Sequence, residues 1–127
     1  MSRVTFTERE LDIMAVLWQH GPSTVTEVRE LIEDELAYTT VLTVLRTLEA
    51  KGRVGHESDG KAHRYVALVE REEAGRSALG RMVEKLFGGS RELLLAQLVE
   101  ERGLGEDELK RLRKILNDRV RGAGGAK

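Results

Sequence analysis

Four side chains at helical spacing could read the edges of DNA bases, and all four lie in one short segment. They are Thr39, Thr43, Arg46 and Ala50. At about 100° per residue, they share one side of a helix. A guanidinium suits guanine edges or phosphate, threonine hydroxyls can bond either, and a methyl group can touch a thymine methyl. The alternative is a solvated face. However, threonine is a poor helix former, and a helix that needed only solubility would carry more charge. The pattern therefore favours DNA recognition.

The helix that carries these side chains is predicted over residues 38–51. Its opposite side is apolar at positions i, i+3, i+4 and i+7, a stripe formed by Val41, Val44, Leu45 and Leu48. Lys51-Gly52 is expected to end it, because glycine can adopt the left-handed conformation there. One face would thus pack against the protein while the other is presented to a groove.

A β-hairpin is predicted next, over residues 54–68. Two short alternating segments flank Asp59-Gly60, and Asp-Gly is a strong signal for a two-residue hairpin turn. Three candidate phosphate contacts lie at or just after the tip: Lys61, His63 and Arg64. Such a hairpin, called a wing, commonly lies along DNA phosphates, and the alternative is an exposed hairpin with incidental charge. We expect no metal at His56 and His63, because the chain has no cysteine and no carboxylate nearby in a ligand-like arrangement. No cofactor is expected either.

Two helices precede this segment, and each begins with a capping box. Thr7 with Glu10 begins the first, which Gly21-Pro22 ends, and Thr24 with Glu27 begins the second. The buried residues expected in the first are Leu11, Met14, Leu17 and Trp18. Those expected in the second are Val25, Val28, Leu31 and Ile32. The other face of the second helix is acidic and should point away from DNA; it carries Glu27, Glu30, Glu33 and Asp34.

The second half of the chain is predicted to be helical. A first apolar stripe ends at Gly88-Gly89 and consists of Leu79, Met82, Val83 and Leu86. Ser90 begins a helix that is apolar on more than one face, through Leu93, Leu94, Leu95, Leu98 and Val99. After Gly103, a last helix carries Leu109, Leu112, Ile115 and Leu116. A helix that is apolar so far round must be buried on two sides. It could pack against the first helix of the same chain, but we favour a second copy of the chain.

Composition and charge limit the function classes. The chain has 127 residues, enough for one domain or two small ones, and no cysteine, which excludes disulfides and a thiol nucleophile and fits the reducing cytoplasm. No apolar segment approaches the roughly 20 residues of a membrane helix, and no signal peptide is expected. Residues 1–35 hold three Lys or Arg and eight Asp or Glu, a net charge of −5. Residues 36–68 hold five and three, a net charge of +2. Because this basic field is weak, DNA affinity should need a dimer and should fall at high salt.

The order of four motifs resembles the BlaI/MecI/CopY penicillinase-repressor family over Thr7 to Asp118. The motifs are TERELDIMAVLW, TVTEVRELI, AYTTVLTVLRTLEAKG and a wing that ends in AHRY. The resemblance implies a dimeric winged-helix repressor on a palindromic operator. We therefore expect a mainly α fold with a small β-hairpin. A winged helix-turn-helix domain would cover residues 1–70, a helical dimerisation domain 71–121 and a disordered tail 122–127.

The resemblance also implies site residues. DNA contact in the major groove is expected from Tyr38, Thr39, Thr40, Thr43 and Arg46, and wing contact from Lys61, His63 and Arg64. Dimerisation is expected through the helices from about Val83 onward. The residues expected there are Val83, Leu86, Leu94, Leu95, Leu98, Val99, Leu109, Leu112 and Leu116.

The two branches of this family differ in how repression is relieved. Copper-responsive members carry a C-terminal cysteine motif, which this chain lacks, so copper sensing of that kind is excluded. The β-lactamase type is cleaved in the dimerisation region, in a pathway run by a membrane sensor protease. The position that resembles the cleaved Asn-Phe bond is Gln97-Leu98, where an apolar residue is kept in type but the asparagine is not.

Two other function classes stay open at this point. A winged-helix module that binds only proteins is compatible with the formal net charge of −1. An enzyme is not expected, because the sequence has no Ser-His-Asp order, no glycine-rich phosphate loop and no paired carboxylates in an apolar setting.

Overall fold

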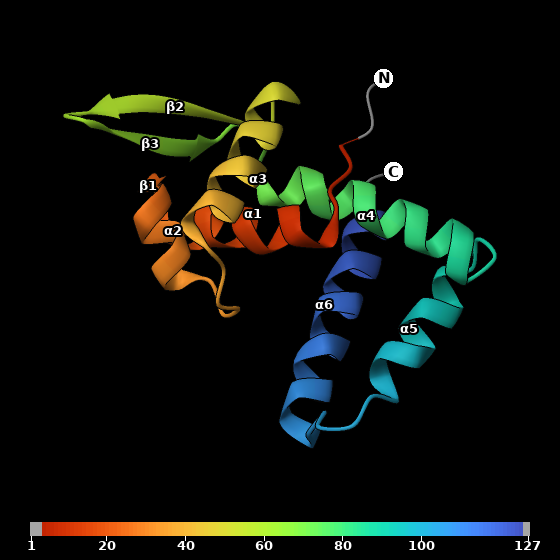
Figure 1. Ribbon diagram of the computed structural model, residues 1–127. Helices are drawn as coiled ribbons and strands as arrows, with labels where there is room; N and C mark the ends of the chain where they lie inside the picture. Colours follow the sequence, from red (N-terminus) through yellow and green to blue (C-terminus); the bar gives the residue numbers. More distant parts are fainter. Residues whose placement is uncertain (1–3, 126–127) are drawn as a thin grey trace. The chain divides into compact units, whose positions relative to one another are not determined.

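The computed structural model describes residues 4–125 and divides the chain into two compact units, Met1–Gly80 and Arg81–Lys127 (Figure 1). The boundary lies ten residues later than expected, because the first half of α4 (Arg71–Leu86) belongs to the first unit. Ala74 of this helix is buried in a small cluster with Val4 and Val69. No helix within residues 4–125 has the length and apolar character needed to cross a membrane.

The first unit is a winged helix-turn-helix. Its elements are α1 (Glu8–His20), β1 (Ser23–Thr24), α2 (Val25–Leu31), α3 (Tyr38–Ala50), β2 (Val54–Asp59) and β3 (Ala62–Ala67). The strands form an antiparallel sheet in the order β1-β3-β2, so the short strand before α2 pairs with the far strand of the hairpin. This pairing fixes the hairpin beside the start of α2.

The core of this unit lies between the three helices and the sheet. Its fully buried side chains are Ile13, Met14, Val28, Val41, Leu45, Leu48 and Val54. The apolar stripe predicted for α3 is therefore confirmed at Val41, Leu45 and Leu48. The face predicted for α1 is partly wrong, since Leu11 is 40% exposed and Ile13 and Val16 are buried instead. The reason is that α1 contacts α2, α3 and β3, so its buried side is wider than one stripe. At the end of α2, Leu31 is also exposed.

Local capping explains where α1 and α2 begin and where α1 and α3 end. Both predicted capping boxes are present, with Thr7 and Glu10 on α1 and Thr24 and Glu27 on α2. Gly21 ends α1 with φ 82°, and Gly52 follows α3 with φ 77°, so both use the left-handed region that glycine tolerates. These are short-range interactions, which is why the sequence pattern located them.

The hairpin turn lies one residue later than predicted. Asp59 pairs with Ala62 in the ladder, so the two turn residues are Gly60 and Lys61 rather than Asp59 and Gly60. Gly60 has φ 64°, and no other residue of the turn has a positive φ. A turn with glycine first needs only one residue of positive φ, whereas a turn over Asp59-Gly60 of the expected type needs two. The shift places Lys61 in the turn itself.

The second unit holds the end of α4, then α5 (Arg91–Val99) and α6 (Glu106–Gly125). Gly88 and Gly89, both at positive φ, end α4, and the Ser90 hydroxyl caps α5 by accepting a hydrogen bond from the Leu93 N–H at 3.1 Å. The last helix differs from the expectation of a disordered tail over 122–127, because α6 continues to Gly125. No proline interrupts its hydrogen-bond ladder there, and residues 126 and 127 lie outside the described residues.

An ion pair joins the start of α1 to the end of α3. The Nζ of Lys51 lies 2.8 Å from the Oε2 of Glu10, whose side chain is 4% exposed. Burial alone would raise the pKa of the Glu10 carboxyl, but Lys51 and the Thr7 N–H together lower it below its ordinary value of 4.5. The pair therefore stabilises the fold while Glu10 is ionised, and this contribution is lost as the pH falls through the lowered pKa.

Replacing Glu10 with glutamine is expected to lower the free energy of unfolding by about 1 kcal/mol at pH 7, because Lys51 is partly exposed and the charged contact is screened. Glutamine can keep the capping box, so the change isolates the ion pair. The difference from wild type should shrink as the pH falls through the lowered pKa of the Glu10 carboxyl, and it should vanish below that pKa, where the carboxyl is protonated in both states. Urea unfolding at neutral and acidic pH measures it, with Glu8→Gln in the same turn as the control. A difference that is constant with pH would contradict this assignment.

Candidate nucleic-acid interface

The exposed face of α3 carries all five predicted major-groove residues. Tyr38, Thr39, Thr40, Thr43 and Arg46 are each exposed, and Tyr38 keeps 46% of its accessible surface. The Thr43 hydroxyl donates to the Thr39 carbonyl at 2.8 Å, one helical turn back. Because this bond uses the hydroxyl proton and restricts the rotamer, Thr43 can offer an acceptor oxygen and a methyl group to a ligand. This face is compact, neutral apart from Arg46, and accessible.

The wing stands beside this face and is linked to it by side chains. The Nδ1 of His56 in β2 lies 2.5 Å from the Oε2 of Glu49 in α3. The ring of His56 stacks on that of His63, with centroids 4.3 Å apart and planes 7° apart. His56 and Tyr65 are opposite in the ladder, and His63 lies diagonally across from His56, so these three rings share one face of the hairpin. The wing therefore has a fixed aromatic surface turned toward α3.

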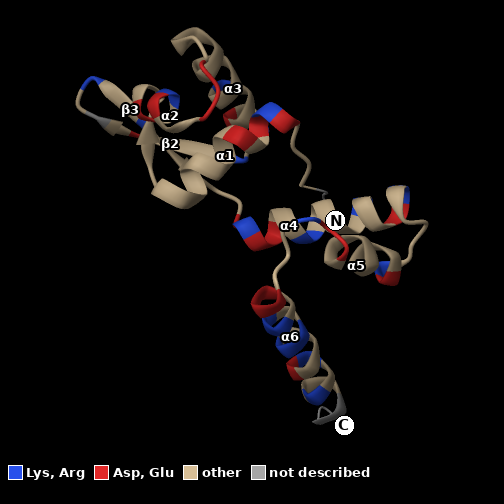
Figure 2. Cartoon of the chain, turned by 90° about the horizontal axis from the view of Figure 1, so that it is seen from below, with Lys and Arg blue, Asp and Glu red and all other residues tan. Residues whose placement is uncertain are grey.

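A groove of about 380 Å³ lies between the start of α2, α3 and the wing. We call it the recognition groove; its lining includes Thr26, Tyr38, Arg46, Glu49, His56, Lys61, His63 and Tyr65. It brings together four of the eight predicted DNA contacts: Tyr38, Arg46, Lys61 and His63. Burial raises the pKa of the Tyr65 hydroxyl, so this side chain stays uncharged in the physiological range. Figure 2 shows basic colour at the hairpin turn, where Lys61 lies.

Thr39, Thr40 and Thr43 lie on α3 but outside the groove lining. Arg64 is also outside it, and its guanidinium points to the start of α2: Nη1 is 2.9 Å from the Oε1 of Glu27 and 3.2 Å from the Pro22 carbonyl. Glu27 thus differs from the other acidic residues on this face of α2, because its carboxylate binds a side chain of β3. The sequence predicts only that this acidic face points away from DNA, and it gives no sign of the contact between Glu27 and Arg64.

Sequence reasoning missed Glu49, His56 and Thr26 as lining residues. A sequence signal was available for Glu49, which follows Arg46 by three positions and so lies on the same side of the helix. For His56 the register of the hairpin was needed, because the pairing of Asp59 with Ala62 places His56 and His63 on one face. Within residues 4–125, no three His, Cys, Asp or Glu side chains are placed to hold a metal ion.

Most of the predicted dimerisation residues are accessible in the single chain. Leu86, Leu95, Leu98, Val99, Leu109 and Leu116 are between 37% and 74% exposed. Leu94 and Leu112 are half-buried, and α5 has no buried residue. Val83 differs from them, because it is only 8% exposed. Gln97 lies on α5 and is exposed as well.

Comparison with known proteins decides the family. The model of the penicillinase repressor family matches residues 6–118. The chain belongs to the penicillinase repressor family. Within this family, it is 38% identical over 122 residues to the transcriptional regulator BlaI of Mycobacterium tuberculosis, covering 91% of this chain and 85% of that protein. It is 26% identical over 110 residues to the methicillin resistance regulatory protein MecI of Staphylococcus aureus, covering 85% and 89%.

A solved structure supports the fold of this penicillinase repressor family member. A MarR family protein from Bacillus stearothermophilus superposes with a TM-score of 0.53 at 20% identity, over 95% of this chain and 77% of that one. The predicted family and winged-helix fold are thus confirmed. The chain is a DNA-binding transcriptional repressor.

Proposed function

We propose that the chain represses transcription as a homodimer on a two-fold symmetric operator, with α3 in the major groove and the wing along the backbone. The recognition groove is the observation that carries this proposal. It holds Arg46 and Tyr38 from α3 together with Lys61 and His63 from the wing. A major groove is about 12 Å wide and admits one helix, and the adjoining phosphates are then within reach of a hairpin. Chromosomal DNA as the target implies action in the cytoplasm.

The proposal of a dimer rests on exposed apolar surface and weak charge. Monomeric proteins rarely expose large contiguous apolar patches, and α5 exposes leucines without burying any residue. The DNA-reading segment, residues 36–68, has a net charge of only +2, from five basic and three acidic residues. Two copies would double the phosphate contacts and align two α3 helices with successive half-sites. Membership of a repressor family favours this role over that of an enzyme or of a module that binds only proteins.

The experiment that tests this function is footprinting of the region upstream of the chain's own gene, followed by gel shifts at two salt concentrations. We expect protection of a palindrome and a steep loss of affinity with added salt. A uniform, sequence-independent affinity, or no shift with any duplex, would contradict the proposal.

We further propose that cleavage at Gln97-Leu98 by a membrane sensor protease relieves repression. The bond lies in exposed α5, and cutting it would detach the last residues of α5 and all of α6 from the DNA-reading unit. To test the consequence, a specific protease site is placed at this bond in the full chain and cut in vitro. We expect operator affinity to fall by about 10²–10⁴-fold, as for loss of bivalent binding. Affinity that is unchanged after complete cutting would exclude this route.

A further inference from the structure

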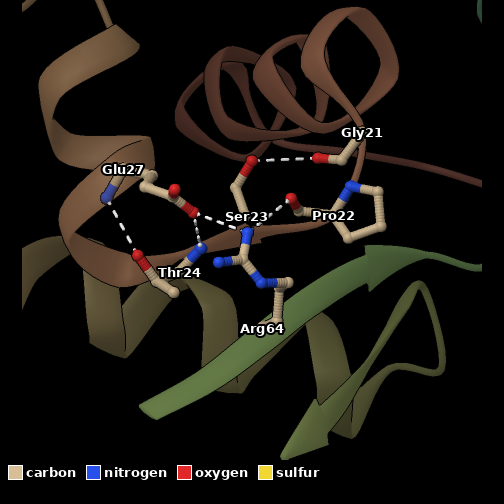
Figure 3. A network of polar contacts seen from close by, with 6 residues as sticks. All are labelled: Gly21, Pro22, Ser23, Thr24, Glu27 and Arg64. Carbon is tan, nitrogen blue, oxygen red and sulfur yellow. Dashed lines mark hydrogen bonds and ion pairs between the residues drawn. The ribbon is translucent and has the colours of Figure 1, made fainter. Parts of the chain in front are cut away.

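The guanidinium of Arg64 lies within a polar network at the base of the wing (Figure 3). Its Nη1 is 2.9 Å from the Glu27 Oε1 and 3.2 Å from the Pro22 carbonyl oxygen. The register of the sheet makes this contact possible, because Thr24 of β1 lies directly opposite Arg64 of β3. Arg64 therefore faces the first turn of α2.

Glu27 is not an ordinary surface carboxylate. It is the third residue of α2, and its Oε1 accepts a hydrogen bond from the Thr24 N–H at 2.9 Å while its own N–H donates to the Thr24 hydroxyl at 3.2 Å. The same Oε1 also accepts from Arg64. Since the capping box fixes the Glu27 rotamer, the carboxylate is a rigid anchor for whatever it binds.

The network continues toward α1. Ser23 is 3% exposed, and its hydroxyl donates to the Gly21 carbonyl at 2.9 Å. Arg64 binds the carbonyl of the next residue, Pro22. Figure 3 shows the Glu27 carboxylate at the start of α2 and the Pro22 carbonyl in the turn between α1 and α2 both meeting the Arg64 guanidinium from β3, with the hydrogen bond between Ser23 and Gly21 beside them. Arg64 thus connects the wing to the turn between α1 and α2.

The other capping box is built in the same way. Glu10 caps α1 and receives Lys51 at the end of α3, with Nζ 2.8 Å from Oε2. Two basic residues of the DNA-reading segment are thus engaged by capping glutamates. Arg46 and Lys61 differ, because the structure shows no ion pair for either among the described residues.

We propose that Arg64 is a positioning residue, which holds the wing in register with α2 and α3 through Glu27, while Lys61 and His63 contact the phosphates. This inference rests on the proposed DNA-binding surface and departs from the expectation that Arg64 itself contacts DNA. The inference and simple electrostatics predict opposite effects for a neutral residue at position 27. Removing the negative charge of Glu27 would strengthen DNA binding if only net charge mattered, but it weakens binding if Glu27 holds Arg64.

The test compares Arg64→Gln, Glu27→Gln, the double variant and Lys61→Gln in the full chain, each titrated at several salt concentrations on one labelled duplex from upstream of the chain's own gene. Glutamine can preserve the capping box at position 27, so α2 should stay folded. We expect Arg64→Gln and Glu27→Gln each to weaken binding about 3–10-fold, and the double variant to be no weaker than the singles, since both remove the same charge-assisted contact. Their salt slopes should match wild type, whereas Lys61→Gln should reduce the slope by about 0.9 for each half-site phosphate lost. Arg64→Lys should recover part of the affinity.

The inference is overturned if Arg64→Gln lowers the salt slope as Lys61→Gln does while Glu27→Gln leaves binding unchanged or tighter. It is also overturned if neither variant at these two positions alters affinity. Failure of the DNA-binding surface itself looks different, because Lys61→Gln would then leave both affinity and slope at the wild-type values.

Discussion

Substituting Leu98 with glutamate is expected to convert the protein to a monomer and to weaken operator binding by about 10²–10⁴-fold, the range set by loss of a linked second site. Leu98 is 45% exposed on α5, so a charge there costs the single chain little. In a dimer core, the same charge would be buried without a partner, which strongly opposes association. The effect is large because each protomer contributes only a weak positive charge to DNA binding.

Light scattering gives the mass of the Leu98→Glu variant, and gel shifts on the footprinted palindrome give its affinity. The matched control is Gln97→Glu, which introduces the same charge on the neighbouring position of α5, about 100° around the helix. We expect the control to stay dimeric. If Leu98→Glu remains a dimer with wild-type affinity, α5 does not form the interface, and the exposed leucines need another explanation.

Replacing Arg46 with alanine is expected to weaken operator binding by about 1–3 kcal/mol and to relax specificity at one base pair of each half-site. Arg46 projects from the exposed side of α3 into the recognition groove, and it is the one basic side chain among the predicted major-groove residues. A guanidinium bound to two acceptors of a guanine loses both bonds when truncated. Because Arg46 is exposed and outside the core, the free energy of unfolding should change little.

Competition binding with single-base variants of the palindrome measures this loss of specificity. Arg76→Ala is a suitable control, because Arg76 is an exposed arginine on α4 of the same unit and does not line the recognition groove. Thr43→Ala should give a smaller loss, through the acceptor oxygen and the methyl group that Thr43 presents. Binding that is unaffected by both Arg46→Ala and Thr43→Ala would show that α3 is not the recognition helix.

The sequence predicted those parts of the fold that short-range interactions decide. Thr7 with Glu10 and Thr24 with Glu27 form capping boxes within four residues, so their spacing alone identified the two helix starts. The apolar stripe of α3 follows from its 3.6-residue period, and the same period placed Thr39, Thr43 and Arg46 on the accessible side. Family membership followed from the order of these local motifs.

Elements packed on several sides were predicted less well. The α1 helix contacts two helices and a strand, so Ile13 and Val16 are buried although they lie off the expected stripe. The first unit extends to Gly80, and Ala74 of α4 is buried in one cluster with Val69 and with Val4, which is distant in sequence. Neither result can be read from periodicity, since each depends on which surfaces meet.

The decisive difference concerns charge. The sequence showed that residues 36–68 are basic and that α2 is acidic, but it could not show which charges meet. Arg64 and Glu27 are 37 residues apart and are brought together by the pairing of β1 with β3. Lys51 and Glu10 are 41 residues apart and meet through the packing of α1 and α3. Capping and helical periodicity act over a few residues, so the sequence alone predicts them. Which basic side chain meets which carboxylate depends on long-range strand pairing and helix packing, so only the tertiary structure decided it.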